Sequence, residues 1–175
     1  MSAVDLNLSE SQTILKKSAR EFLAAECPPS LVRRMEDDPR GYPADLWRRI
    51  AQMGWLGIVV PEAYGGHEGG FLDLLVLLQE TGRAALPGPF FSTAVLAGFA
   101  ILDGASAEQK RSLLPRLCNG ELLLSLALSE PGVDFGLDHL ATTAVSHGGG
   151  HSITGTKVFV PDAHVAEFLL CVASR

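Results

Sequence analysis

The sequence predicts an α+β fold in which an all-helical bundle is followed by an incomplete antiparallel β domain. Apolar residues recur at helical spacing up to Gly120 and form shorter, strand-like runs after it. The first part also contains two helix-capping boxes, and the second contains a glycine-rich hairpin signature. We therefore assign residues 1–120 to an N-terminal helical domain and residues 121–175 to part of a β domain.

The first helix is expected to begin after Ser9 and to end before Pro28. Ser9 and Gln12 form a capping box, in which the two side chains satisfy N–H groups at a helix start. Pro28 and Pro29 end the pattern, because proline has no N–H to donate. Further helical stripes of apolar residues cover residues 43–53, 71–83, about 90–102 and 106–119. The short connections between them are typical of antiparallel neighbours in a bundle.

The remaining segments are expected to form turns and strands. Residues 56–61 are expected to form a short extended segment, and the glycine-rich residues 64–70 a turn. The run from His147 to His151 contains three glycines and predicts the turn of a hairpin, because glycine reaches positive φ without a clash. Strands are expected over residues 121–128, 139–146, 152–160 and 165–173, which makes a sheet of three or four strands.

Composition limits the classes of protein that this chain can belong to. Hydrophobic residues make up 47% of its 175 residues, which excludes a disordered chain. A net charge of −6 disfavours nucleic-acid binding, because an acidic surface repels phosphate. Three widely spaced cysteines and a pair of histidines separated by glycines predict neither a disulfide framework nor a metal site. Without a secretory signal or an apolar stretch of about 20 residues, we expect a cytoplasmic protein with no membrane span.

Four segments, taken in order, carry a more specific signal. They are Gly54-Trp55-Leu56-Gly57, Val60-Pro61-Glu62-Ala63-Tyr64-Gly65-Gly66, Ala127-Leu128-Ser129-Glu130-Pro131-Gly132 and Thr154-Gly155-Thr156-Lys157-Val158-Phe159-Val160. Their order and spacing resemble the acyl-CoA dehydrogenase family. The resemblance covers essentially the whole chain, from the first helix to the last strand.

The resemblance implies a fold and an activity. Members of this family have an N-terminal helical domain, a middle β domain and a C-terminal four-helix bundle, and they bind FAD between the last two. They oxidise the Cα–Cβ bond of an acyl-CoA thioester in fatty-acid metabolism, pass electrons to an electron-transfer flavoprotein, and form homo- or hetero-oligomers. The resemblance puts their catalytic glutamate beyond residue 175, so we expect this chain alone to be inactive and Glu130 to be a turn residue.

The resemblance also implies binding residues. Those expected to contact the cofactor are Leu128, Ser129, Gly132, Phe159, Val160 and Pro161. Those expected to contact the substrate are Phe90, Phe91 and Phe135. An aromatic residue at position 159 would exclude water from the path of the hydride.

Three departures from the family pattern keep other functions open. Phe135 stands where a serine is usual, Pro161 where a threonine hydroxyl is usual, and Asp162 where asparagine is usual. Each change removes a hydrogen-bond donor to the cofactor. The alternatives are a non-catalytic subunit that shapes an interface for a partner, and a flavin oxidase of the same fold. The central prediction is that Ser129 and Phe159 together form one wall of a flavin cleft, rather than a turn residue and a core aromatic.

Overall fold

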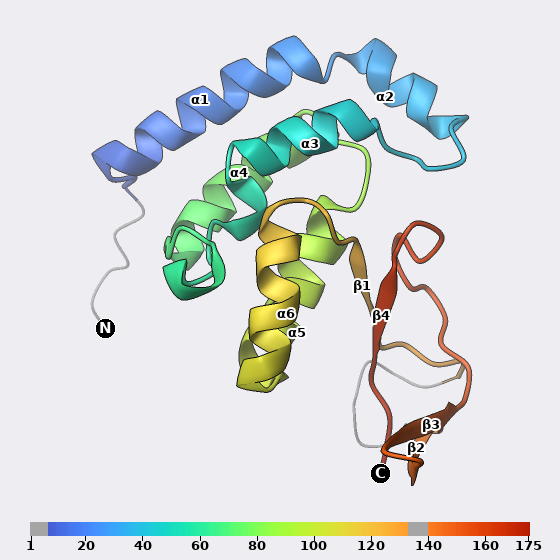
Figure 1. Cartoon of the computed structure of the whole chain (residues 1–175). Helices are drawn as coiled ribbons and strands as arrows, with labels where there is room; N and C mark the ends of the chain where they lie inside the picture. Colours follow the sequence, from blue (N-terminus) through green and yellow to red (C-terminus); the bar gives the residue numbers. More distant parts are fainter. Residues whose placement is uncertain (1–6, 133–139) are drawn as a thin grey trace, which may run out of the picture.

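The computed structural model describes residues 7–132 and 140–175, and the predictions at Phe135 and His139 lie outside these ranges (Figure 1). The helices are α1 (Glu10–Glu26), α2 (Pro29–Glu36), α3 (Ala44–Gln52), α4 (Phe71–Arg83), α5 (Gly98–Gly104) and α6 (Ala107–Cys118). Shorter helical segments are η1 (Trp55–Gly57), η2 (Glu62–Tyr64) and the π-helical η3 (Phe91–Ala97). The strands are β1 (Leu124–Ala127), β2 (Thr143–His147), β3 (Gly150–Thr154) and β4 (Phe168–Cys171).

Both predicted capping boxes are present. The Ser9 hydroxyl accepts from Gln12 N at 3.2 Å, and the Gln12 side chain accepts from Ser9 N at 3.1 Å. Ser106 and Gln109 repeat the arrangement at the start of α6. These local contacts fix where the two helices begin.

The expectation of an extended segment over residues 56–61 is wrong. Its first residues form η1, and the chain then turns back on itself. His67 N donates to Gly57 O at 3.0 Å, and Glu68 N donates to Val60 O at 2.9 Å. Leu56 and Val60 are buried against the helices rather than in a sheet. The apolar run therefore marks burial in a tight turn, which periodicity alone does not distinguish from a buried strand.

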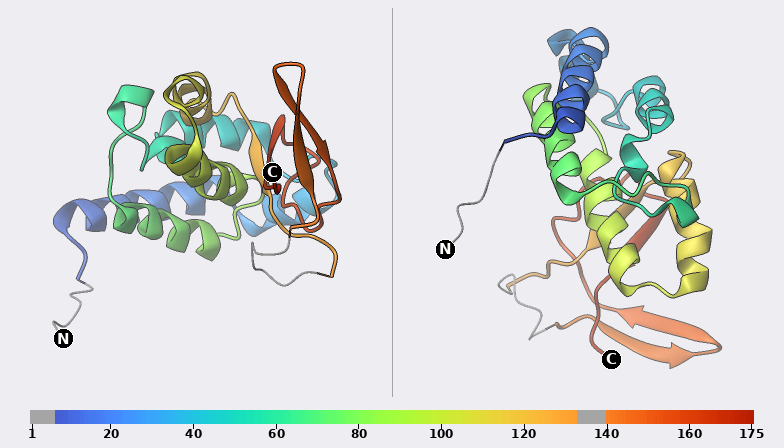
Figure 2. Two further views of the ribbon diagram at one scale, coloured as in Figure 1. Left: turned by 90° about the horizontal axis from the view of Figure 1, so that it is seen from below. Right: turned by 90° about the vertical axis from the view of Figure 1, so that its left-hand side faces the viewer.

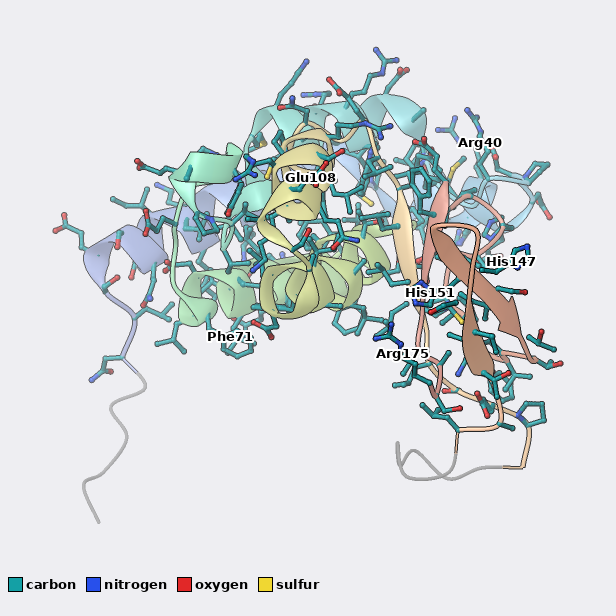
Figure 3. The ribbon with its side chains drawn as sticks, turned by 60° about the horizontal axis from the view of Figure 1, so that its bottom comes forward. Arg40, Phe71, Glu108, His147, His151 and Arg175 are labelled. Carbon is teal, nitrogen blue, oxygen red and sulfur yellow. The ribbon has the colours of Figure 1, made fainter. Side chains whose placement is uncertain are left out.

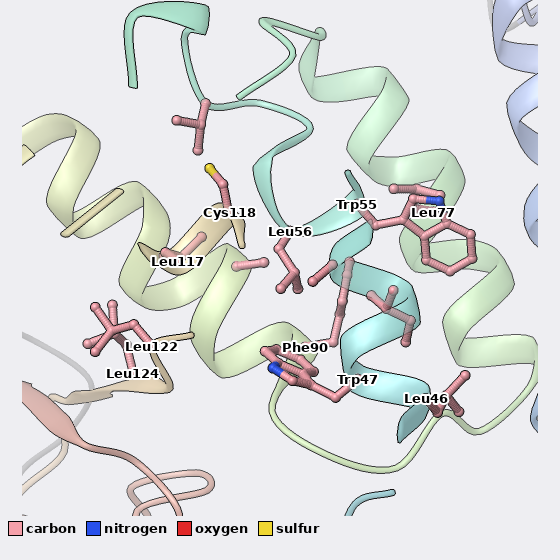
Figure 4. Packing of buried hydrophobic residues seen from close by; sticks show 14 of the residues in the cluster. Leu46, Trp47, Trp55, Leu56, Leu77, Phe90, Leu117, Cys118, Leu122 and Leu124 are labelled. Atoms are coloured by element: carbon pink, nitrogen blue, oxygen red, sulfur yellow. The ribbon is translucent and has the colours of Figure 1, made fainter. Parts of the chain in front are cut away.

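One hydrophobic core joins the helices to the first strand (Figure 4). Trp47 and Leu117 lie in it together with Leu122 and Leu124, which follow the predicted domain boundary at residue 120. The buried Thr93 hydroxyl of η3 donates to Leu124 O at 2.9 Å and accepts from Leu124 N at 3.1 Å. The boundary at residue 120 stays a prediction, and β1 packs directly on the helices.

The α+β fold class is confirmed, with one correction to the strand directions. β2 and β3 form the predicted antiparallel hairpin, whose turn glycines Gly148 and Gly149 have φ values of 56° and 85°, but β3 ends at Thr154 and not at residue 160 as expected. β1 and β4 instead pair in parallel, with Leu124 opposite Phe168. A parallel pair requires a long connection, and the intervening residues supply it by forming the hairpin. Two separate two-stranded sheets, β1–β4 and β2–β3, therefore replace the single sheet that the sequence predicts.

The hairpin lies at the opposite end of the molecule from α1 (Figure 2). His147 and His151 both belong to it, and their side chains are exposed (Figure 3). Within the described part of the chain, no group of three or more histidine, cysteine, aspartate or glutamate side chains is suited to a metal ion. Across residues 7–132 and 140–175, none of the helices combines the length and the apolar character needed to cross a membrane.

Candidate functional site

The structure brings together the segment around Ser129 and the segment around Phe159, which the sequence predicts to lie side by side. Val158 N donates to Ser129 O at 2.9 Å, which joins the turn after β1 to the residues just before Phe159. The Lys157 ammonium donates to Leu128 O at 3.0 Å and strengthens the same junction. Ser129 is half-buried and its carbonyl is occupied, so its hydroxyl is the side-chain group that could serve a ligand. The role of these residues in binding a cofactor stays a prediction.

Phe159 is not a core aromatic, because 93% of its surface is exposed. Its φ is 52°, in the left-handed region that bulky residues rarely adopt. Such strain persists where the surrounding structure imposes it, and it is common at functional sites. The backbone therefore holds a large apolar ring out from the protein, where it can contact a ligand or another protein segment.

The residues after Phe159 are anchored to β1 and to η3. The Ser125 hydroxyl of β1 donates to Pro161 O. The Ser92 hydroxyl, at the start of η3, donates to Asp162 Oδ2 at 2.5 Å. Pro161 has no N–H, so this stretch of backbone offers no donor at that position. Val160, between Phe159 and Pro161, is half-buried, and Gly132 is exposed.

Phe90 and Phe91, two of the residues predicted to contact a substrate, line one cavity. Phe90 is buried, whereas 52% of the Phe91 surface is exposed. Both line a hollow of about 390 Å³ between the end of α4 and the start of η3. The other residues that line it are Leu78, Thr81, Gly82, Ala85, Leu86 and Gly88. The lining is mainly apolar, which suits an apolar ligand.

Glu130 and Lys157 form a buried ion pair that sequence reasoning did not identify. The Lys157 ammonium lies 2.6 Å from Glu130 Oε1, and the two side chains are 8% and 2% exposed. Glu130 also accepts from Ala141 N at 2.6 Å and from Thr142 N at 3.0 Å. Hydrogen bonding to Lys157, assisted by these backbone groups, lowers the pKa of Glu130 to about 2. The available signal was a lysine directly before the apolar run Val158-Phe159-Val160, because a buried charge requires a partner.

Glu80 of α4 is the second buried glutamate with charged partners. It accepts from Arg20 Nε at 3.0 Å and from the Arg20 terminal nitrogen at 2.8 Å, and Arg83 adds a third contact at 3.3 Å. The Arg20 hydrogen bond lowers the pKa of Glu80 below its ordinary value. A general base needs a pKa near the working pH, so neither Glu80 nor Glu130 suits that role.

Comparison with known proteins decides the family. The protein-family model for the acyl-CoA dehydrogenase N-terminal domain matches residues 9–121 of this sequence, which is more than half of the chain. This chain belongs to the acyl-CoA dehydrogenase family. The match includes α1 to α6 and both capping boxes, so the helical part has the family's N-terminal fold.

Curated acyl-CoA dehydrogenase relatives match nearly the whole chain. An acryloyl-CoA reductase (NADH) from Anaerotignum propionicum is 32% identical over 176 residues, which cover 99% of this chain and 44% of that protein. The acyl-CoA dehydrogenase FadE26 of Mycobacterium tuberculosis is 30% identical over 169 residues, 94% of this chain and 42% of its own length. The chain therefore spans less than half the length of these relatives.

Solved structures of the family agree with the fold described above. A variant of the steroid acyl-CoA dehydrogenase Tcur3481–Tcur3483 superposes with a TM-score of 0.83 at 37% identity, covering 94% of this chain and 45% of that one. The ChsE4–ChsE5 complex from Mycobacterium tuberculosis gives a TM-score of 0.78 at 28% identity, covering 98% and 45%.

Proposed function

We propose that this chain is part of an FAD-dependent acyl-CoA dehydrogenase, which oxidises the Cα–Cβ bond of an acyl-CoA thioester. The chain would supply one wall of the flavin cleft and the residues that line the site of the acyl chain. The observation that carries the proposal is the exposed Phe159 ring, held at positive φ beside the Ser129 turn. In a folded protein, a strained and almost fully exposed phenylalanine favours a role in contact with a ligand.

The residues near Phe159 fit a flavin in part. FAD, when bound, would accept the hydride from the substrate. Phe159 would pack against its ring system, the Ser129 hydroxyl would hydrogen-bond to it, and Leu128 and Val160 would line the same wall. Pro161 contributes no donor, and its carbonyl already accepts from Ser125. The proposed wall therefore acts mainly through shape and exclusion of water.

The cavity beside Phe90 and Phe91 is the proposed site of the acyl chain. Its volume of about 390 Å³ lies in the range typical of small-molecule sites. The Ser92–Asp162 hydrogen bond joins its edge to the segment that carries Phe159. Because both described glutamates with buried side chains are held in ion pairs, we propose that the catalytic base lies outside these 175 residues.

The names of the relatives support the proposed partners. One relative is the CarC subunit of a caffeyl-CoA reductase–Etf complex, and one structural neighbour is the ChsE4–ChsE5 complex. We therefore propose an electron-transfer flavoprotein as electron acceptor and an assembly of like or related subunits. Because relatives are named both dehydrogenases and reductases, assays must follow the reaction in both directions.

The natural product of the gene, purified from its host, tests this function. We expect a yellow protein whose flavin absorbance bleaches when an acyl-CoA is added without oxygen. Phe159→Ala is expected to weaken FAD binding about tenfold, corresponding to about 1.4 kcal/mol, without changing the melting temperature of the FAD-free protein, because the ring contacts little of this chain. A protein that remained colourless after reconstitution with FAD, alone and with its co-purifying partners, would refute the proposal.

Pro161 favours a second candidate, a non-catalytic subunit of a heteromeric dehydrogenase. It lacks the hydroxyl and the N–H that the family pattern would provide for the cofactor. This candidate predicts a colourless chain that co-purifies with a yellow, related subunit. The oxidase alternative predicts a yellow protein that forms hydrogen peroxide in the presence of acyl-CoA and oxygen.

Phe91 tests the proposed acyl site. Phe91→Ala enlarges the cavity, so we expect kcat/KM for longer acyl chains to rise about tenfold relative to short ones. The half-exposed ring makes this variant safer than Phe90→Ala, which would open a hole in the core. Leu72→Ala, an exposed change on α4 that does not line the cavity, is the matched control. Unchanged chain-length preference in Phe91→Ala would exclude the cavity as the acyl site.

A further inference from the structure

We propose that Ser92 and Asp162 are a pair of positioning residues that fixes the Phe159 loop to the wall of the apolar cavity. Here the Phe159 loop denotes residues 158–166, and the cavity is the one lined by Phe90 and Phe91. The inference deepens the proposed function and rests on it for its meaning in catalysis. The physical link itself is a property of this chain alone.

The contact joins two parts of the chain that are 70 residues apart. The Ser92 side chain is buried, and its hydroxyl donates to Asp162 Oδ2 at 2.5 Å. A hydroxyl bound to a carboxylate makes a short, charge-assisted hydrogen bond, which is stronger than a neutral one. Pro89 O, at 3.2 Å from the same hydroxyl, is the weaker competitor for its proton.

Each partner also organises its own segment. Asp162 has a φ of 53°, and its carbonyl accepts from Val165 N and Ala166 N, both at 3.1 Å. Ser92 lies in the first turn of η3, where Thr93 N donates to Pro89 O at 2.9 Å. The side-chain bond therefore ties a turn of the Phe159 loop to the turn that carries Phe90 and Phe91.

Other hydrogen bonds also hold the loop, among them Val158–Ser129, His164–Arg40 and Ser125–Pro161, but none of these three reaches η3 directly. Ser125 belongs to β1, and its hydroxyl reaches Pro161 O without touching the cavity lining. Removing the Ser125 hydroxyl would loosen the loop and leave the Thr93–Leu124 hydrogen bonds in place. The Ser92–Asp162 contact joins the loop directly to η3 beside the cavity, whereas Ser125 is connected to η3 only through its neighbour Leu124, which is hydrogen-bonded to Thr93.

Amide hydrogen exchange on the full chain, followed by NMR without FAD or acyl-CoA, tests the proposal. In Ser92→Ala we expect the Val165 and Ala166 amides to exchange about tenfold faster, although the change lies on η3. In Asp162→Ala we expect the Thr93 amide to exchange faster by a similar factor. Asp162→Asn keeps an acceptor and tolerates positive φ, but its hydrogen bond to Ser92 is neutral, so it should restore most of the wild-type protection in both segments.

Ser125→Ala is the matched control, expected to speed exchange in the loop while leaving Thr93 unchanged. The proposal is overturned if Ser92→Ala affects only its own turn, or if Asp162→Asn behaves like Asp162→Ala. A chain that passes this test but binds neither FAD nor acyl-CoA would overturn the proposed function and leave the link intact. Flavin binding together with uncoupled exchange would overturn the link and leave the proposed function intact.

Discussion

Lys157→Met is expected to lower the melting temperature by about 10 °C, because it leaves the Glu130 carboxylate buried without its cation. Lys157 also donates to Leu128 O, so the variant loses a second hydrogen bond at the same junction. The double variant Lys157→Met, Glu130→Gln should be less destabilised than the sum of the two single changes, since neither charge is then left alone. Thermal unfolding followed by circular dichroism measures all three.

At acidic pH, the difference in melting temperature between Lys157→Met and the natural chain should become smaller. The pKa of Glu130 is lowered from 4.5 to about 2, so its contribution to stability is complete above about pH 4.5 and is lost as pH falls towards 2. In the variant, protonation relieves an unpaired carboxylate, so its deficit should shrink over the same range.

Arg48→Met is the matched control for the loss of a cation. Its ion pair with Asp45 is exposed, with side chains 70% and 87% accessible, and exposed pairs contribute little to stability. Equal melting temperatures for Lys157→Met and Arg48→Met would mean that the buried pair does not hold the Ser129 turn.

Gly66→Ala is expected to cost about 3 kcal/mol of folding free energy. A Cβ at this position would lie 2.0 Å from Val60 O and 2.5 Å from Val60 C. These are backbone atoms of a buried residue, and Val60 O already accepts from Glu68 N. The turn must therefore open, because backbone atoms cannot move aside as a flexible side chain would. Chemical denaturation measures the loss.

Gly82→Ala provides the control for adding a methyl group to glycine. Gly82 belongs to α4, and among the described residues no atom outside its chain neighbours and the helix's own backbone lies within 4 Å of a Cβ at this position. Alanine is a better helix former, so this variant should gain about 0.5–1 kcal/mol. Wild-type stability in Gly66→Ala would contradict the packing of residues 57–60 against residues 66–69.

Much of the helical part could be predicted because its signals are local. The capping box at Ser9 involves residues three apart, and it marks the start of α1 without reference to the rest of the chain. The same holds for Ser106 and α6. The error at residues 56–61 has the opposite origin, since their burial comes from contacts with the helices and with the turn after them.

For the candidate site, the sequence could predict only which two segments lie next to each other. Motif order linked the Ser129 turn to the residues before Phe159, and the hydrogen bond between Val158 and Ser129 joins them in the structure. The exposure of Phe159, the partner of Lys157 and the contact between Ser92 and Asp162 did not follow from the motifs. Each depends on which distant side chain occupies the neighbouring space.

The amino-acid sequence by itself determined where α1 and α6 begin and the family to which the motifs point, but it did not reveal α2 (Pro29–Glu36). Tertiary structure alone decided that β4 runs parallel to β1, that one lysine and one glutamate are buried together, and that a phenylalanine faces outward. The physical reason is range: capping and periodicity act within about one helical turn, whereas strand direction and burial are set by contacts between residues that only the folded chain brings together.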